Sequence, residues 1–312
     1  MKFRKPVEFF FWIVASLTIL GTILRLTIRD YFSASATLYY MTPLSMLVIG
    51  AGALLVRQVY LRKKNPARIW GALLLLLFVW WVRVDWRSHP QPKKIDDEIV
   101  VLLANIARHH SVNEIAKHAL KYDPDIICFI EALAMTSQQR KQWETVFPDH
   151  QWSMIDGGTQ LFAKGTISSP WVNPLPDGTR LSRSVIKLNG KEIHCFTVDI
   201  ASTIYRYRKP AIDGLTEFLK TSDGENILIL GDFNTPGDSV HFTELRKDYE
   251  NLFDSVGDGY APSWPAPIPV LTLDQIWIGK KLEPIGCRLI SNRRSDHKMV
   301  LGRFRVPVPI SP

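Results

Sequence analysis

The sequence predicts a layered α/β or α+β domain behind a membrane anchor, and two observations predict it. Long uncharged runs dominate the chain before about residue 90, whereas the later part has the mixed composition of a soluble domain. In that later part, apolar runs paired by turn signals are mixed with helical stripes, which is typical of layered folds and not of a simple parallel sheet. We expect an anchor over residues 1–88, a linker over 89–97, the globular domain over 98–307 and a tail over 308–312.

The anchor is predicted from three apolar runs at residues 7–24, 31–56 and 69–82. A membrane-spanning helix needs about 20 apolar residues. The first two runs are long enough, and the third is extended because Arg68 and Arg83 at its ends can reach the membrane surface. The first run could instead be a cleaved signal peptide, but it has no small-x-small cleavage site and two further runs follow it. The sequence therefore predicts three transmembrane α-helices.

The distribution of basic residues predicts how the anchor is oriented. Three basic residues lie in residues 2–5 and five in residues 57–68, whereas the first loop has only Arg25 and Arg29. Cytoplasmic segments carry an excess of Lys and Arg, so we expect the N-terminus to be cytoplasmic. Three crossings then place the globular domain outside the cytoplasm, on a multi-pass protein of the cell membrane.

The net charge is divided between the two parts of the chain. Residues 1–94 contain 14 of the 38 basic residues and 3 of the 30 acidic residues. The rest of the chain therefore has 24 basic and 27 acidic residues, a net charge of −3. Proteins dedicated to nucleic acid normally show a basic surplus on the binding domain, so DNA or RNA is not the expected main ligand. Three cysteines in apolar runs without close pairing, Cys128, Cys195 and Cys287, predict buried thiols rather than disulfides.

Elements of the globular domain are predicted from apolar periodicity and turn signals. Asn189-Gly190 between two apolar runs is a strong signal for a type I′ hairpin. The uncharged run 227–230 before Gly231 predicts a buried strand. No regular element is expected in the Pro-rich residues 260–270. The expected strands are 99–106, 126–130, 151–155, 160–163, 184–188, 192–200, 227–232, 272–278 and 298–304, and the expected helices are 112–122, 136–147, 211–220 and 240–246.

Polar side chains recur at the ends of these strands. Asp232 and Asn234 directly follow one strand, and Asn105 and Glu131 end two others. An Asp-x-Asn sequence alone is a common turn, since both side chains bond backbone amides. Buried polar groups cost free energy unless they are hydrogen-bonded or have a functional role. The recurrence of polar residues at several strand ends therefore favours a functional site. Asp274 and the sequence Ser295-Asp296-His297 complete the set.

The segments ANIARHH, DPDIICFIEA, GDFNTP, LDQIWI and RSDHKMV stand in this order within about residues 97–306. In this order they resemble the endonuclease/exonuclease/phosphatase superfamily, the metal-dependent phosphodiesterases with a DNase I-like fold. They look most like its membrane-anchored bacterial branch, which includes proteins associated with glycopeptide resistance. The resemblance implies an α/β sandwich of two packed mixed β-sheets flanked by helices.

The resemblance also implies a divalent metal ion, Mg²⁺ or Mn²⁺. Glu131 is the expected first ligand, with Asn105 and Asp296 as helpers. Phosphodiesters and pyrophosphates are anionic, and nucleophilic attack builds up more charge on phosphorus. A hard cation held by carboxylate oxygens offsets that charge.

The chemistry is assigned to four residues by the same resemblance. Asp232 is expected to orient and deprotonate the attacking water, and Asn234 to hold that water or a phosphate oxygen. His297 is expected to hydrogen-bond the phosphate or the water. Asp274 is expected to pair with His297 and raise its pKa. Taken singly, each residue has an ordinary alternative as a strand end, a cap or a surface pair.

One position departs from the family pattern. A second His is usual at the end of the strand after the hairpin, and Asp199 stands there instead. His194 cannot replace it, because strand alternation puts His194 on the opposite face. Three alternatives remain for Asp199: it binds a second metal ion, it holds a nearby Arg, or it marks a weakened enzyme.

Substrate contacts are expected from the loop after that strand and from the Pro-rich segment. Arg206 and Arg208 are candidates for phosphate contacts, and Trp264 for contact with lipid or a leaving group. The alternatives are a solvated basic run and packing over a sheet edge. Arg293 and Arg294 beside Ser295, and His109 and His110 after the first strand, are further candidates.

The leading expectation is a membrane-anchored, extracytoplasmic, Mg²⁺-dependent phosphoesterase that acts on a phosphodiester or pyrophosphate, with a lipid-linked substrate favoured by the anchor. A membrane-anchored nuclease is the second hypothesis and requires a basic surface near the motifs. A catalytically impaired interaction module is the third, and Asp199 motivates it. The sequence leaves the substrate, the number of metal ions and the oligomeric state open.

Overall fold

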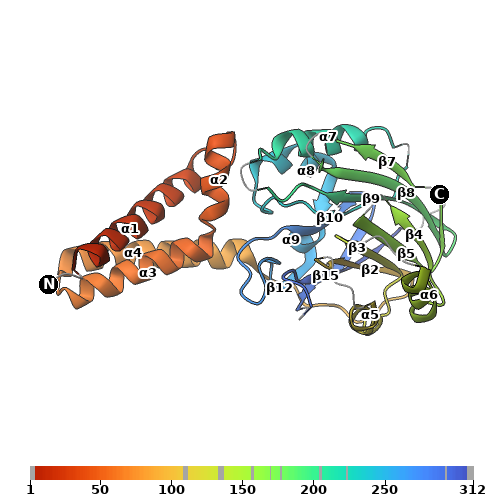
Figure 1. Cartoon of the computed structure of the whole chain (residues 1–312), viewed down its shortest axis with the longest axis horizontal. Coiled ribbons are helices and arrows are strands. Elements are labelled where there is room, and N and C mark those ends of the chain that lie inside the picture. Colours follow the sequence, from red (N-terminus) through yellow and green to blue (C-terminus); the bar gives the residue numbers. More distant parts are fainter. Residues whose placement is uncertain are drawn as a thin grey trace. The chain divides into compact units, whose positions relative to one another are not determined.

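The computed structural model describes residues 4–107, 112–132, 137–155, 158–168, 170–175, 178–203, 206–222, 224–291 and 294–307. The chain divides into two compact units (Figure 1). The first comprises Met1–Trp86 with Thr203–Tyr207, and the second comprises Arg87–Ser202 with Arg208–Pro312.

The first unit contains four helices, α1 (Arg4–Leu26), α2 (Ser33–Met41), α3 (Leu44–Tyr60) and α4 (Lys64–Asp85). Only α1 and α4 are individually long and apolar enough to span a membrane, among the residues described. The run expected as one continuous second span is broken into α2 and α3, which are bent by 62°. The unit therefore offers two candidate spans, or three if the bent pair crosses as one.

The break between α2 and α3 has a physical cause that composition did not reveal. Pro43 precedes α3, and the residue before a proline is disfavoured in helical conformation, so α2 ends ahead of Thr42. Arg25 of α1 donates hydrogen bonds to the carbonyls of Thr42 (2.9 Å) and Tyr39 (3.3 Å). The bond to Thr42 satisfies a backbone acceptor at the end of α2, and the Tyr39 carbonyl, which also accepts from the Thr42 N–H (3.4 Å), gains a second donor. The buried Arg25 thereby stabilises the break.

The second unit is built on two β-sheets. The first sheet has the strand order β1-β12-β14-β15-β2-β3-β5-β4, and the second has the order β11-β13-β10-β9-β8-β6, with β7 also paired to β8. Both sheets contain parallel and antiparallel pairs. The strands are β1 (Trp86–Ser88), β2 (Glu98–Asn105), β3 (Ile126–Ile130), β4 (Gln151–Ile155), β5 (Thr159–Ala163), β6 (Thr166–Ile167), β7 (Trp171–Pro174), β8 (Arg180–Leu188), β9 (Lys191–Asp199), β10 (Ile227–Asp232), β11 (Tyr249–Asn251), β12 (Gly257–Tyr260), β13 (Asp274–Gly279), β14 (Glu283–Ile290) and β15 (Met299–Arg305).

The two sheets pack face to face, with helices on their outer sides (Figure 1). Leu228 and Leu230 of β10 belong to the core between the sheets, whereas Ile229 packs on the outer side against α7. Because both faces of the strand are covered, its sequence is continuously apolar and does not alternate. The outer helices are α5 (Val112–Leu120) and α6 (Ser137–Val146) on the first sheet, and α7 (Lys209–Leu219), η3 (Val240–Thr243) and α8 (Leu245–Asp248) on the second; α9 (Leu252–Val256) follows β11.

The predicted sandwich of two mixed sheets flanked by helices is confirmed. The hairpin β8–β9 turns at Asn189 (φ 51°) and Gly190 (φ 75°), as its signal predicted. Strand β14 was not predicted, because Pro284 and Gly286 interrupt its apolar pattern and its pairing with β15 shifts between them.

Strand direction brings the polar strand ends together. β2 and β3 are parallel, and so are β9 and β10, so Asn105 and Ile130 are paired at one end, as are Asp199 and Asp232. β13 runs antiparallel to β10, which places its first residue, Asp274, opposite Asp232.

Candidate active site

The site begins where β10 ends. Gly231 lies so close to β9 that a Cβ atom there would overlap the Val198 carbonyl, so only glycine fits. Asp232 is 1% exposed. Its Oδ1 accepts from the backbone N–H of Asn234 (2.8 Å), a turn that Asn234 permits by adopting φ 45°.

Asn105 connects the two sheets across this site. Its amide Nδ2 donates to Oδ2 of Asp232 (3.0 Å) and to Oε1 of Glu131 (3.2 Å), and its Oδ1 accepts from the N–H of Ala107 (2.9 Å). Asn105 therefore orients both carboxylates. Glu131 has φ 53°, a conformation that non-glycine residues adopt with strain and that is frequent at functional sites.

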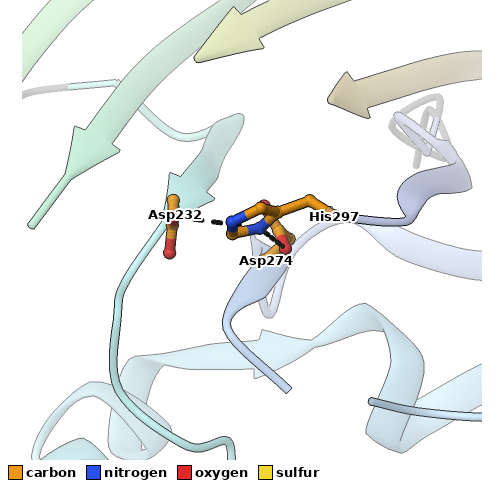
Figure 2. Close-up of side chains that lie close together, drawn as sticks. All are labelled: Asp232, Asp274 and His297. Carbon is orange, nitrogen blue, oxygen red and sulfur yellow. Dashed lines mark hydrogen bonds and ion pairs between the residues drawn. The ribbon is translucent and has the colours of Figure 1, made fainter. Parts of the chain in front are cut away.

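His297 and Asp274 form a buried pair next to Asp232 (Figure 2). Nδ1 of His297 lies 2.8 Å from Oδ2 of Asp274 and 4.0 Å from Oδ2 of Asp232. The pairing expected from the sequence is therefore present. Because Nδ1–H donates to Asp274, the tautomer is set and Nε2 is left for a ligand.

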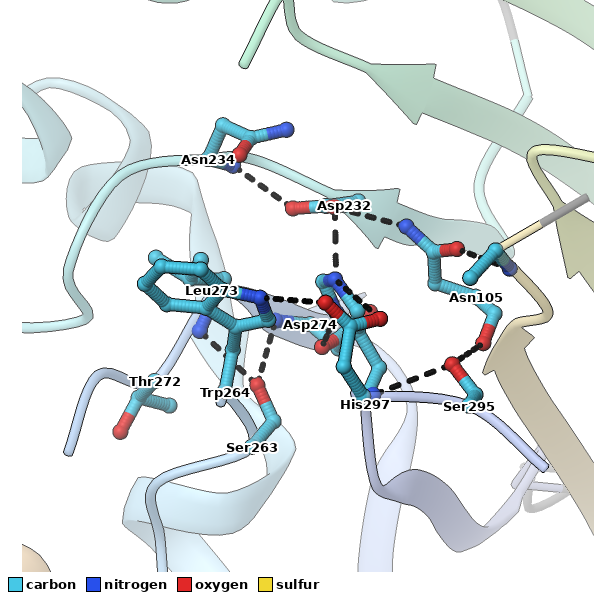
Figure 3. Close-up of polar contacts among 12 residues, drawn as sticks. Asn105, Asp232, Asn234, Ser263, Trp264, Thr272, Leu273, Asp274, Ser295 and His297 are labelled. Carbon is cyan, nitrogen blue, oxygen red and sulfur yellow. Dashed lines mark hydrogen bonds and ion pairs between the residues drawn. The ribbon is translucent and has the colours of Figure 1, made fainter. Parts of the chain in front are cut away.

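Two serines hold this pair in place (Figure 3). The hydroxyl of Ser263 accepts from the N–H groups of Leu273 and Asp274, both at 3.1 Å. The hydroxyl of Ser295 donates to the carbonyl of Asn105 (2.8 Å), and its oxygen accepts from the N–H of His297 (3.0 Å). Sequence analysis assigned neither serine a role: Ser295 could have been found from its place beside Asp296, but Ser263 has no local signal.

The electrostatics of the site shift two pKa values. Burial, with the neighbouring charge of Asp274, raises the pKa of Asp232 to about 7, although His297 opposes the shift. Burial alone would lower the pKa of His297, but the charge and hydrogen bond of Asp274, together with Asp232, raise it to about 9. At neutral pH the imidazole is therefore protonated, and Asp232 is poised to exchange a proton.

The donor set fits a divalent cation best at Glu131. Asp232, Asp274 and His297 are the one trio of acidic, His or Cys ligand atoms within 4.8 Å of one another in the described part of the chain. An imidazolium is no metal ligand, however, and the Asp274 side chain is fully buried. Glu131 is half-exposed, which suits Mg²⁺ because this ion keeps several waters and substrate oxygens.

Asp296 and Trp264 lie together beside His297. Figure 3 shows Trp264 and His297 in this arrangement. The indole N–H of Trp264 donates to Oδ2 of Asp296 (3.0 Å), and the ring centroids of Trp264 and His297 are 6.5 Å apart. The Asp296 side chain is 53% exposed, and its Oδ1 lies 4.0 Å from Nε2 of His297. Trp264 thus lies at the site, and its contact with a substrate stays a prediction.

Asp199 lies next to Asp232 in the strand register and holds an arginine. Its Oδ2 is 3.7 Å from Nη1 of Arg180, so one of the three alternatives for this position is realised. Arg180 itself was missed because it stands at the start of β8 without a motif. As expected, His194 lies on the other face, where it contacts Arg183 and Glu192.

The basic residues predicted as substrate contacts have different positions relative to the Asp232–Asp274–His297 group. Arg208 is only 2% exposed, and its Nε donates to the carbonyl of Asn234 (3.0 Å), so it supports the Asn234 turn and is not part of a solvated basic run. Its contact with phosphate stays a prediction. Arg206 belongs to the first unit, so its approach to the site stays a prediction. Arg294 pairs with Glu114 (2.6 Å). Arg293, His109 and His110 lie outside the described residues.

Comparisons with known proteins agree on the fold. The model of the Endonuclease/Exonuclease/phosphatase family matches residues 102–297. Similar solved structures include a humanized D. rerio TDP2 (TM-score 0.56, 13% identity, 67% of this chain and 100% of that one). D. rerio TDP2 complexed with single strand DNA product (0.54, 12%, 67% and 100%) and the Bacteroides thetaiotaomicron mannosyl-6-phosphatase Bt3783 (0.54, 14%, 67% and 100%) are also similar. Among curated proteins, none matches the sequence.

Proposed function

Because the chain belongs to the endonuclease/exonuclease/phosphatase family, we propose that it is a membrane-anchored, metal-dependent phosphoesterase that cleaves a phosphodiester or pyrophosphate outside the cytoplasm. One observation carries the proposal. Asp232 and the His297–Asp274 pair meet at the joined ends of two sheets, and Asn105 links Asp232 to Glu131. The site thus brings together a general base (Asp232), a proton donor (His297) and a carboxylate that can bind a cation (Glu131).

Asp232 is the group that accepts the proton of the attacking water. Its burial and its pKa of about 7 suit a general base at neutral pH. Asn105 and the N–H of Asn234 hold the carboxylate in one orientation. The side-chain amide of Asn234 donates to the carbonyl of Ile200 (2.7 Å), which fixes the turn that contains Asn234. The remaining hydrogen-bonding groups of this amide hold the water or a phosphate oxygen.

His297 supplies positive charge to the phosphate. As an imidazolium it donates Nδ1–H to Asp274 and presents Nε2–H to a non-bridging oxygen or to the leaving group. This donor favours the reaction because negative charge grows on the phosphate as the water attacks.

A divalent cation, Mg²⁺ or Mn²⁺, would be held by Glu131 with Asn105 and Asp296 as further ligands. When bound, it would offset the negative charge on the phosphate. Asn105 retains a lone pair on Oδ1 beyond its bond to Ala107, so it can serve both carboxylates and a cation.

The anchor supports a substrate that also resides in the membrane. Helices α1 and α4 are each long and apolar enough to span a bilayer. If the bent pair α2–α3 makes a third crossing, the basic residues of the flanking segments favour an external catalytic domain. The slightly acidic globular part and the likeness of its motifs to the membrane-anchored bacterial branch support lipid-linked phosphates or pyrophosphates over nucleic acid. The second candidate is a nuclease, favoured by the structural likeness to D. rerio TDP2 complexed with single strand DNA product.

The test uses the full chain in detergent micelles, with bis(p-nitrophenyl) phosphate, a lipid pyrophosphate and single-stranded DNA as substrates. We expect Mg²⁺-dependent release from the first two, abolished by EDTA and by Asp232→Ala. Faster turnover of DNA would favour the nuclease. Absence of metal-dependent release from all three would support the impaired interaction module. Alkaline phosphatase fused to the C-terminus reports the side of the membrane, since it is active only outside the cytoplasm.

A further inference from the structure

Four charged residues form one row across the second sheet. In the strand register, Arg180 of β8 is paired with Asp199 of β9, Asp199 with Asp232 of β10, and Asp232 with Asp274 of β13. Neighbouring strands are about 4.8 Å apart, so the backbone of Arg180 lies about 10 Å from that of Asp232.

The row lies on the inner face of the sheet, toward the first sheet. Side chains two residues apart share a face, and Ile186 of β8 and Leu230 of β10, which have the same parity as Arg180 and Asp232, belong to the core between the sheets. The apolar core therefore ends in this charged row, with Arg180 as its one cation.

The guanidinium of Arg180 also approaches the first sheet. A Cβ atom on Gly158 would overlap Nη1 of Arg180 and would lie 3.9 Å from the carbonyl of Ala132. Ala132 directly follows Glu131, and its N–H donates to the Gly158 carbonyl (2.7 Å). Arg180 thus reaches the backbone next to the proposed metal ligand. The absence of a side chain at Gly158 makes room for it.

Exposure separates the two members of the ion pair. The Arg180 side chain is 42% exposed and that of Asp199 only 15%. The Asp199 carboxylate is therefore largely covered, whereas the Arg180 side chain is partly exposed to solvent. A guanidinium presents several N–H donors in a planar fork that matches phosphate oxygens.

We propose that Arg180 binds the non-bridging oxygens of the substrate phosphate, and that Asp199 is a positioning residue that holds the guanidinium in place. This inference rests on the proposed phosphoesterase function. Arg180 adds positive charge beside the carboxylates of Glu131, Asp199 and Asp232, which by themselves repel an anionic substrate. Asp199 thereby acts through Arg180 and not as a ligand of a second metal ion.

The test compares Arg180→Ala with Arg183→Ala in the full chain. Arg183 lies on the same strand with opposite parity, on the outer face, where it contacts His194. A charge-assisted contact to phosphate predicts that kcat/KM falls on the order of 10- to 100-fold in R180A and less than about threefold in R183A. R180K should recover part of the loss, and added guanidinium ion should partly restore R180A. Thermal unfolding confirms that both variants fold.

The role of Asp199 is tested by combining substitutions. D199N should lower kcat/KM less than R180A does, and the R180A/D199N double variant should match R180A, because Asp199 acts only through the arginine. A full additional loss in the double variant would show that Asp199 acts by itself and would overturn the positioning role.

Calorimetry with inorganic phosphate separates this inference from the proposed function. If the wild-type chain hydrolyses its substrates but R180A equals R183A, the Arg180 assignment is wrong and the phosphoesterase stands. If the wild type hydrolyses nothing, the proposed function fails. In that case phosphate binding that R180A loses and R183A keeps still supports the anion site, and binding unchanged in R180A rejects it.

Discussion

Nδ1 of His297 donates to Oδ2 of Asp274 over 2.8 Å, and both side chains are buried within the second unit. The bond joins residues 23 positions apart. It makes the imidazole a cation at neutral pH and aims its other nitrogen away from Asp274 (Figure 2). We expect the proposed activity to depend on this pair.

Asp274→Asn should lower the pKa of His297, because it replaces the negative charge that stabilises the imidazolium. We expect kcat to fall on the order of 10²- to 10⁴-fold at pH 7.5, the range typical for a lost acid or base. NMR titration of the His297 ring protons measures the pKa directly. Asp258→Asn, at an exposed position of β12, is the matched control. An unchanged His297 titration in D274N would contradict the assigned partnership.

The rate should depend on pH with two limbs. Ionisation of Asp232 increases activity as pH rises through about 7, and loss of the His297 proton decreases it as pH rises through about 9. The two groups interact, so the limbs report on the pair together. The measurement is kcat/KM from pH 5 to 10 at fixed ionic strength. A bound cation should move the lower limb to more acidic pH, and a rate independent of pH between 5 and 10 would contradict the assignment.

Asp232→Asn should stabilise the protein at high pH. The folded-state pKa of Asp232 is raised from 3.8 to about 7, so the penalty on folding grows as pH rises between these two values and is complete above about pH 7; the amide variant removes it. Without metal we expect the free energy of unfolding at pH 8.5 to increase on the order of 1–3 kcal/mol, while activity is lost. Denaturant unfolding at pH 5 and 8.5 checks this. Equal effects at the two pH values would show that charge is not the cause.

Glu131→Gln should remove metal binding. Mg²⁺ that binds only the folded chain raises the unfolding temperature of the wild type, and this increase should vanish in E131Q because one N–H₂ group replaces a carboxylate oxygen. Differential scanning fluorimetry without Mg²⁺ and over a series of Mg²⁺ concentrations measures the shift in unfolding temperature, and this readout does not depend on turnover. Glu283→Gln, whose exposed carboxylate pairs with Arg305, serves as control. A Mg²⁺ response retained in E131Q would place the cation elsewhere.

Gly231→Ala should disrupt the second sheet. The new Cβ would overlap the Val198 carbonyl between the parallel strands β9 and β10. We expect a loss on the order of 1–3 kcal/mol or more, as for other overpacked interior positions. Gly237→Ala, where the Cβ would meet only ordinary contacts with Thr272, should change stability by less than about 1 kcal/mol. Urea unfolding compares the two, and a mild effect of G231A would mean that the strands separate easily.

The sequence predicted the elements that carry a local signal. The run before Gly231 forms β10, the 126–130 run forms β3, and Asn189-Gly190 turns the β8–β9 hairpin. The order and spacing of short motifs also indicated the family, and the resemblance implied the His297–Asp274 pair. Each of these rests on residues near one another in the chain, or on a resemblance that already encodes the fold.

The sequence by itself therefore determined the two-part organisation, the apolar strands and the polar residues at their ends. Only the tertiary structure decided that Pro43 and Arg25 break the second apolar run, that Ser263 holds Asp274, and that Arg180 stands in one row with Asp199 and Asp232. The physical reason is the range of the interactions. A strand's residue pattern fixes which face is buried, but its register against partners tens of residues away is fixed by backbone hydrogen bonds and packing of the whole sheet.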